Sequence, residues 1–277
     1  MCLTCGCGSD DVRVSLPGSS EPSHLHDHGH EHGHEHGHEH ETLVLEERLL
    51  AKNDHLAEHV RAFLAVRRMT AVNLMSSPGS GKTSLLERTI AELGDGQPVY
   101  VVEGDQETSF DAERIERAGA RAVQVNTGSG CHLDAGMVGR SLRALDPVPG
   151  SLLFVENVGN LVCPALFDVG EHARTVVISV TEGDDKPLKY PTMFASADLV
   201  VVNKIDLLPH VDFDLRRLED QARSLNRDVT VLALSVRTGE HVRDWYAWLS
   251  SLAAHHEERT AAERREEGEP HGAAVGP

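Results

Sequence analysis

The chain has 277 residues and a formal charge of −18 at pH 7, from 26 basic and 44 acidic side chains. Its basic residues form no cluster, which argues against nucleic acid as a partner, and no apolar run reaches the roughly 18 residues of a membrane span. The first residues lack the apolar stretch of a signal peptide, so we expect a cytoplasmic protein with five reduced cysteines.

Composition divides the chain into three parts. Residues 1–41 are almost without apolar periodicity beyond their first few positions, so we expect a disordered N-terminal arm. Residues 255–277 are charged and then small, which predicts a disordered tail. Residues 42–254 are sufficient for one globular domain with a large apolar core.

The arm opens with a cysteine cluster, "MCLTCGCG". Cys2, Cys5 and Cys7 can close on one metal ion, with the terminal amine as a fourth ligand if Met1 is retained. Mixed nitrogen and sulfur ligation in a square plane favours Ni(II), whereas a tetrahedron favours Zn(II). We therefore predict metal binding at this cluster and leave both ions open on chemistry alone.

A histidine tract follows in the arm, "HLHDHGHEHGHEHGHEH", and holds nine of the 18 histidines. Alternating imidazoles on a flexible arm can bind several divalent ions weakly and reversibly, so we predict metal storage. The alternative is a low-complexity insert without a selected role. The expected ligands are His24, His26, His28, His30, His32, His34, His36, His38 and His40.

The globular part begins with one or two amphipathic helices and continues with short apolar runs that alternate with helical patterns. The runs are continuous, as in strands covered on both faces. This rhythm predicts an α/β fold with a mostly parallel sheet of about seven strands and helices on both faces. The expected strands are 71–75, 99–103, 122–126, 152–156, 176–180, 199–203 and 229–235.

A phosphate-binding loop follows the first of these strands. In "SSPGSGKTSLLERTI", Gly81, Lys82 and Thr83 match the end of the P-loop motif, and Ser76 replaces its first glycine. Such a loop points backbone amides at phosphate oxygens, while its lysine reaches the β- and γ-phosphates and its hydroxyl coordinates Mg²⁺. The alternative is an ordinary glycine turn before a helix. The predicted phosphate contacts are Gly79, Ser80, Gly81, Lys82, Thr83 and Ser84.

A base-recognition motif follows the strand at 199–203. Asn203, Lys204 and Asp206 form the N-K-x-D pattern in "VVVNKIDLL". The Asp206 carboxylate can accept hydrogen bonds from guanine N1–H and the 2-amino group, a pair that adenine does not offer. Ser235 in "ALSVRTG" loosely matches a further base-contacting loop. These residues predict GTP as the nucleotide.

Two more strand ends supply acidic residues. In "FVENVGN", Glu156 and Gly159 fit the place of D-x-x-G, with Glu156 expected at the Mg²⁺ shell and the Gly159 amide at the γ-phosphate. Asp105 is a second candidate on the Mg²⁺ side, whereas Asp111 is either a further one or a helix N-terminal acid. The expected catalytic set is Lys82, Thr83, Asp105 and Glu156.

A third group of metal ligands lies inside the globular domain. Cys131 and His132 are adjacent in "NTGSGCHLDAG", and Cys163 occurs in "NLVCPALFDVG". Both loops follow strands, so the three side chains are expected at the ligand-binding edge of the sheet, in an open site that a second subunit could complete. The alternative is two buried structural thiols and a helix-capping histidine.

Together these motifs resemble the hydrogenase nickel-insertion GTPases of the HypB family. The resemblance covers the N-terminal cluster and essentially the whole globular domain, and Ser76 is itself typical of that family. The most specific stretches are "CLTCGCG", "NLMSSPGSGKTSLLERT", "NTGSGCHLDA", "ENVGNLVCP" and "EGDDKPLKYPTMF".

The resemblance implies a P-loop GTPase of the SIMIBI type that works with GTP, Mg²⁺, Ni²⁺ and Zn²⁺. The N-terminal cysteines then look like a high-affinity nickel site, and Cys131, His132 and Cys163 like a nickel or zinc site at a GTP-dependent homodimer interface. Implied partners are a small zinc-containing maturation protein, a nickel chaperone and the [NiFe]-hydrogenase large subunit. The function implied is storage of nickel and its delivery during hydrogenase maturation.

Two other functions compete with this one. A urease accessory GTPase would carry Cys-Pro-His, whereas Ala165 follows Cys163 and Pro164 here, and it would lack the N-terminal cysteine cluster. A nickel store without significant GTPase activity is disfavoured by the intact Lys82 and Asp206.

Overall fold

The structure is a computed structural model that describes residues 13–15, 38–94, 96–105, 110–128 and 130–268. Its side chains are described within residues 47–256, apart from 95, 106–110 and 129. Within this part of the chain, no helix combines the length and apolarity needed to cross a membrane.

In the described part of the chain, an eight-stranded sheet forms the centre of the fold, in the order β1-β4-β3-β5-β2-β6-β7-β8. Only the short β1 runs antiparallel to its neighbour, and the other seven strands are parallel. The predicted seven-stranded parallel sheet is therefore confirmed, with β1 as an addition. The strands are β1 (Arg13–Ser15), β2 (Thr70–Ser76), β3 (Val99–Asp105), β4 (Arg121–Asn126), β5 (Leu152–Gly159), β6 (Ala173–Ser179), β7 (Leu199–Asn203) and β8 (Thr230–Ala233).

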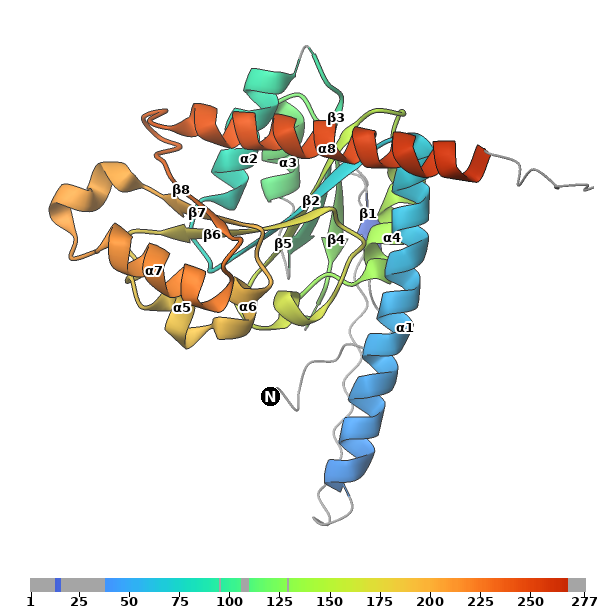
Figure 1. Ribbon diagram of the computed structural model, residues 1–277, viewed down its shortest axis with the longest axis horizontal. Helices are drawn as coiled ribbons and strands as arrows, with labels where there is room; N and C mark the ends of the chain where they lie inside the picture. Colours follow the sequence, from blue (N-terminus) through green and yellow to red (C-terminus); the bar gives the residue numbers. More distant parts are fainter. Residues whose placement is uncertain (1–12, 16–37, 95, 106–109, 129, 269–277) are drawn as a thin grey trace, which may run out of the picture.

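Helices cover both faces of the sheet (Figure 1). One face packs against α2, α3 and α8, and the other against α1, α4 and the group α5 to α7. The helices are α1 (His38–Arg67), α2 (Lys82–Leu93), α3 (Phe110–Arg117), α4 (Ala135–Leu145), α5 (Lys186–Lys189), α6 (Pro191–Ala195), α7 (Leu215–Leu225) and α8 (Val242–Gly268), with 3₁₀ turns η1 (Cys163–Leu166) and η2 (Ile205–His210).

The strands supply apolar side chains to both layers. In β7, Val201 packs into the core under α2 and α8, whereas its neighbours Val200 and Val202 pack into the core under α6 and α7. Trp245 of α8 is fully buried, and its indole nitrogen donates to Thr89 Oγ1 of α2 at 2.9 Å. This hydrogen bond links the two helices that cover the first face. Burial on both faces explains why these strands lack a polar–apolar alternation.

The helical region ahead of the P-loop is one long helix, α1. Its C-terminal part packs against α4 and the sheet through Val60 and Leu64, whereas Leu49 is 38% exposed. The N-terminal part extends beyond the sheet (Figure 1). Because α1 begins at His38 and α8 continues to Gly268, both helices run past the domain limits expected at residues 42 and 254.

One buried side chain, Asn53, attaches α1 to the loops at the edge of the sheet. Its Nδ2 donates to the carbonyl oxygen of Asp168 at 2.8 Å, and its Oδ1 accepts from the backbone N–H of Ala135 at 3.0 Å. Asn53 is only 4% exposed; its contact with Ala135 is buried, and its contact with Asp168 is partly buried. The helix therefore holds together the loop after β4 and the segment after η1.

We predict that Asn53→Ala lowers the free energy of unfolding by about 1–3 kcal/mol, because it leaves the buried amide of Ala135 and the partly buried carbonyl of Asp168 without their partner. Urea unfolding of the full chain measures the loss. Asp54→Ala is the matched control, since it makes a similar truncation on the exposed side of the same helix. Equal losses in the two variants would show that Asn53 does not hold the loops.

Candidate nucleotide and metal site

The P-loop joins β2 to α2 in a tight turn. Gly79 and Gly81 adopt left-handed backbone angles, with φ of 74° and 102°. Lys82 Nζ donates to Ser76 Oγ at 2.6 Å, so the serine that replaces the first motif glycine contacts the lysine directly. Burial lowers the pKa of Lys82, and the nearby carboxylate of Glu156 opposes that shift. The hydrogen bond to Ser76 therefore holds the lysine against the loop, near the carboxylate of Glu156.

Thr83 of α2 and Glu156 of β5 are in contact beside this loop. Thr83 Oγ1 donates to Glu156 Oε1 at 2.6 Å, and Glu156 Oε2 is buried without a hydrogen-bond partner among the described residues. Burial raises the pKa of Glu156, while Lys82 lowers it. A hydroxyl beside an unsatisfied carboxylate oxygen fits Mg²⁺, which binds oxygen ligands. The residues present therefore suit the cation that the motif implies.

A second buried carboxylate, Glu103, was missed by the sequence analysis. It lies opposite Glu156 in the register of β3 and β5, is 2% exposed, and has an Oε2 atom without a partner in the described residues. Burial and the charge of Glu156 raise the pKa of Glu103 to about 9. A glutamate at the end of a continuous apolar run was the signal that could have identified it.

The other acidic candidates occupy less enclosed positions. Asp105 ends β3 with an incompletely buried side chain, and its carbonyl accepts from the N–H of Thr127 at 3.0 Å. Asp111 lies in the first turn of α3 and accepts from Arg114 at 2.8 Å. The same arginine donates to Ser84 Oγ at 3.4 Å. Asp111 is therefore engaged in an ion pair at a helix N-terminus, one of its two expected roles.

The N-K-x-D segment contacts the P-loop directly. Asn203 Nδ2 donates to the carbonyl of Ser80 at 2.9 Å, and Lys204 Nζ donates to the carbonyl of Gly79 at 2.7 Å. Ser235 Oγ donates to Asp206 Oδ1 at 2.6 Å. Three stretches that are distant in sequence thus meet at one edge of the sheet, as expected for a nucleotide site.

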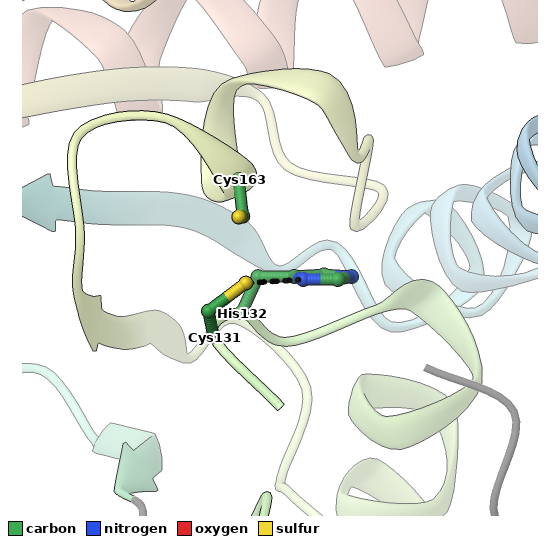
Figure 2. A group of neighbouring side chains, drawn as sticks. All are labelled: Cys131, His132 and Cys163. Atoms are coloured by element: carbon green, nitrogen blue, oxygen red, sulfur yellow. Dashed lines mark hydrogen bonds between the residues drawn. The ribbon is translucent and has the colours of Figure 1, made fainter. Parts of the chain in front are cut away.

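Cys131, His132 and Cys163 come together beside this edge (Figure 2). One potential ligand atom from each residue lies within 4.8 Å of the others, and Cys131 Sγ is 3.7 Å from His132 Nδ1. His132 is 3% exposed, and its ring stacks on the ring of Phe167 with 3.8 Å between the ring centroids. Burial lowers the pKa of His132, against the pull of a nearby aspartate, and so favours the neutral imidazole that binds metals.

The alternative role of His132 as a helix cap does not hold. Asp134 occupies the N-cap of α4, where its side chain accepts from the N–H of Met137 at 2.7 Å. Cys131 and Cys163 are both only partly buried, unlike structural core thiols. Two partly exposed thiols and one buried imidazole therefore form a group of the kind that binds Ni(II) or Zn(II).

A pocket of about 390 Å³ lies between the P-loop and the metal-ligand group. The P-loop contributes Ser77 and Pro78, and the opposite side contributes Gly159 and Cys131. Gly159 approaches Pro78 so closely that a Cβ at this glycine would lie 3.2 Å from the proline Cα. The same pocket therefore contacts both the phosphate loop and the loop that carries Cys131.

The segment after β6 adds two residues that the motif search did not assign. Glu182 accepts from the hydroxyl of Ser77 and from the N–H of Ser179, the latter at 3.0 Å. Lys186 Nζ pairs with Glu182 at 3.2 Å and also lines the pocket. Glu182 and Lys186 belong to "EGDDKPLKYPTMF", whose acidic and basic residues after a strand were the available signal.

The predicted ligands of the arm lie mostly outside the described residues. This applies to Cys2, Cys5 and Cys7 and to the histidines from His24 to His36. His38 and His40 lie in α1, but their side chains are outside the described part of the structure. These assignments stay predictions.

Comparisons with known proteins agree with this arrangement. A family model described as the CobW/HypB/UreG nucleotide-binding domain matches residues 70–233. Hydrogenase maturation factor HypB of Azotobacter vinelandii is 55% identical over 207 residues, which cover 75% of this chain and 68% of the relative. The protein of the same name from Escherichia coli K12 is 42% identical over 286 residues, which cover 91% of this chain and 99% of the relative. The crystal structure of HypB from Helicobacter pylori in complex with nickel matches with a TM-score of 0.70 and 36% identity, over 74% and 96% of the two chains.

We predict that Gly81→Ala destabilises the protein more than Gly79→Ala. Both positions have positive φ, which costs an L-residue roughly 1–2 kcal/mol. A Cβ at Gly81 would also lie 2.5 Å from Asn203 Nδ2, whereas a Cβ at Gly79 meets nothing within 4 Å. Chemical denaturation of both variants gives the difference. Equal unfolding free energies would contradict the close contact between the P-loop and Asn203.

Proposed function

Because this chain belongs to the HypB family of hydrogenase maturation factors, we propose that it is a GTP-hydrolysing nickel metallochaperone. It stores nickel and delivers it to the [NiFe]-hydrogenase large subunit. The observation that carries the proposal is the path of β5. This strand brings Glu156 to Thr83 of the P-loop and then continues directly into the segment that carries Cys163. Nucleotide and metal ligands are thus joined by a few residues.

The nucleotide half of the proposal is supported by the contacts around the P-loop. Lys82 reaches the terminal phosphates, and the Asp206 carboxylate accepts from guanine, with Ser235 fixing its orientation. Thr83 and Glu156 would hold Mg²⁺, which supplies charge neutralisation at the phosphates when bound. Asp105 is assigned to the same side of the site, at the end of β3.

The metal half is supported by the donor set of Cys131, His132 and Cys163. Two sulfurs and one nitrogen suit nickel as the cargo and also suit zinc. Three protein ligands leave at least one coordination position for an incoming group. The thiolates of Cys2, Cys5 and Cys7 and the histidine tract act as the store that fills this site.

An exposed apolar surface beside the metal ligands supports a homodimer. Val162 and Leu166 flank the Cys163 turn and are 54% and 53% exposed. Leu188 is 58% exposed and belongs to α5, whose Lys186 lines the same pocket as Val162. A second copy docked there, promoted by GTP and metal, would complete the open coordination. We assign the cytoplasm as the location, with a small zinc-containing maturation protein, a nickel chaperone and the hydrogenase large subunit as partners.

One relative favours a second function. A protein from Helicobacter hepaticus named hydrogenase/urease maturation factor HypB is 41% identical over 206 residues. Service to a urease is therefore the alternative, although Ala165 stands where a urease accessory GTPase would carry histidine. Storage of nickel without significant hydrolysis is the other alternative.

The first test compares the full chain with Lys82→Ala. We expect the unchanged protein to hydrolyse GTP and to restore hydrogenase activity in a host that lacks its own copy. Lys82→Ala should lose both, while the nickel bound by the full chain stays unchanged. Hydrolysis in the unchanged protein that does not exceed that of Lys82→Ala would favour the storage role. Restoration of urease but not hydrogenase would favour the urease role.

The second test concerns the base. Asp206→Asn should lose GTP affinity and gain affinity for xanthine nucleotides, because an amide donor replaces the carboxylate acceptor. Equilibrium binding of both nucleotides measures the exchange, with the exposed Asp228→Asn as the control. A GTP affinity that stays within about threefold, or ~0.65 kcal/mol, would remove Asp206 from base recognition.

A further inference from the structure

Helix α1 presents two exposed histidines one turn apart. His55 and His59 are four residues apart, and their Nε2 atoms approach to 3.2 Å. Their rings meet edge to face with centroids 4.6 Å apart. Neither residue belongs to the N-terminal tract or to the group at Cys131. We propose that His55 and His59 form a separate divalent-metal site on the outer face of α1.

The separation of the two nitrogens fits a shared metal ion. With metal–nitrogen bonds of about 2.0–2.1 Å, a spacing of 3.2 Å corresponds to a nitrogen–metal–nitrogen angle of about 100°. This angle lies between the values of about 90° for a square plane and about 109° for a tetrahedron. Histidines at positions i and i+4 of a helix are a recurring metal-binding pair. The site therefore suits imidazole-binding ions such as Ni(II) and Zn(II).

Metal binding changes the proton that the two rings share. Without metal, the 3.2 Å contact is an N–H···N hydrogen bond, so one ring carries its proton on Nε2. An ion needs a lone pair from both Nε2 atoms, which moves that proton to the Nδ1 atom of the same ring. His55 Nδ1 lies 3.7 Å from Glu58 Oε2, so this carboxylate stands beside the position that would then donate. A carboxylate behind a metal-bound histidine is a common supporting arrangement.

The exposure of the pair determines the strength of the site. The side chains of His55 and Glu58 are 69% and 75% exposed, and His59 is also on the exposed face. Two protein ligands leave the remaining positions to water, so the ion exchanges freely and binds more weakly than at a site with three ligands.

The position of the pair within α1 gives the site a place in the molecule. The helix begins at His38, inside the histidine tract, and Asn53 lies two residues before His55. Asn53 contacts Ala135 and Asp168, which follow the two segments that carry the internal metal ligands. An ion at His55 and His59 would therefore rest on the helix that connects the tract to the internal site. No step of the proposed nucleotide cycle requires it.

The test is a calorimetric titration with NiCl₂ on the full-length chain. Its background carries asparagine at the nine tract histidines and serine at Cys2, Cys5 and Cys7, so that arm ligands do not contribute. We expect a weak class of one ion that His59→Asn abolishes or weakens by at least about tenfold. Cys163→Ser should leave the weak class unchanged, which distinguishes the histidine pair from the internal site. This result is expected even if the proposed function fails.

Two further variants keep the number of histidines constant. Ala51→His combined with His59→Asn rebuilds a pair at i and i+4 with His55, on another exposed position. Asp54→His combined with His59→Asn places two histidines next to each other, where they cannot face one ion. Only the first should recover the weak class, while circular dichroism reports the helix content of each variant. Unchanged binding in His59→Asn, or equal recovery in both double variants, would overturn the site.

Discussion

The hydrogen bond from Thr83 to Glu156 joins the P-loop helix to β5, the strand that leads to the candidate metal ligand Cys163. Thr83 belongs to the first turn of the P-loop helix, and Glu156 belongs to β5, whose next residues reach Gly159 and then Cys163. Asn160 continues the connection, because its side chain donates to the carbonyl of Cys131 at 3.5 Å. A change at the phosphate end of β5 is therefore placed to alter the position of both sulfur ligands.

Electrostatics make this junction sensitive to a cation. Glu103 and Glu156 are buried opposite each other, and each keeps an oxygen without a hydrogen-bond partner in the described part of the chain. Two carboxylates in this setting disfavour joint ionisation, which agrees with the pKa of about 9 for Glu103. A cation at Thr83 and Glu156 would lower this cost, so its arrival with a nucleotide would change the charge state at the phosphate end of β5.

The sequence predicted those features that depend on local pattern. Continuous apolar runs identified the parallel strands, and strand ends placed the P-loop, Asn203 and Cys131 at one edge of the sheet. Spacing alone could not give the contacts across that edge. The hydrogen bond from Lys82 to Ser76 and the capping role of Asp134 depend on three-dimensional packing. Glu103 escaped notice because a buried acid within an apolar strand belongs to no short motif.

The most direct test of the junction is a metal titration in two nucleotide states. Nickel and zinc affinities of Cys131, His132 and Cys163 would be measured with GDP and with a non-hydrolysable GTP analogue, in a chain whose arm ligands are replaced. The account predicts affinities that differ roughly 5- to 150-fold between the states, and a reciprocal change in relative nucleotide affinity of the same factor. Equal metal affinities in both states, with no change in dimerisation, would contradict coupling through β5.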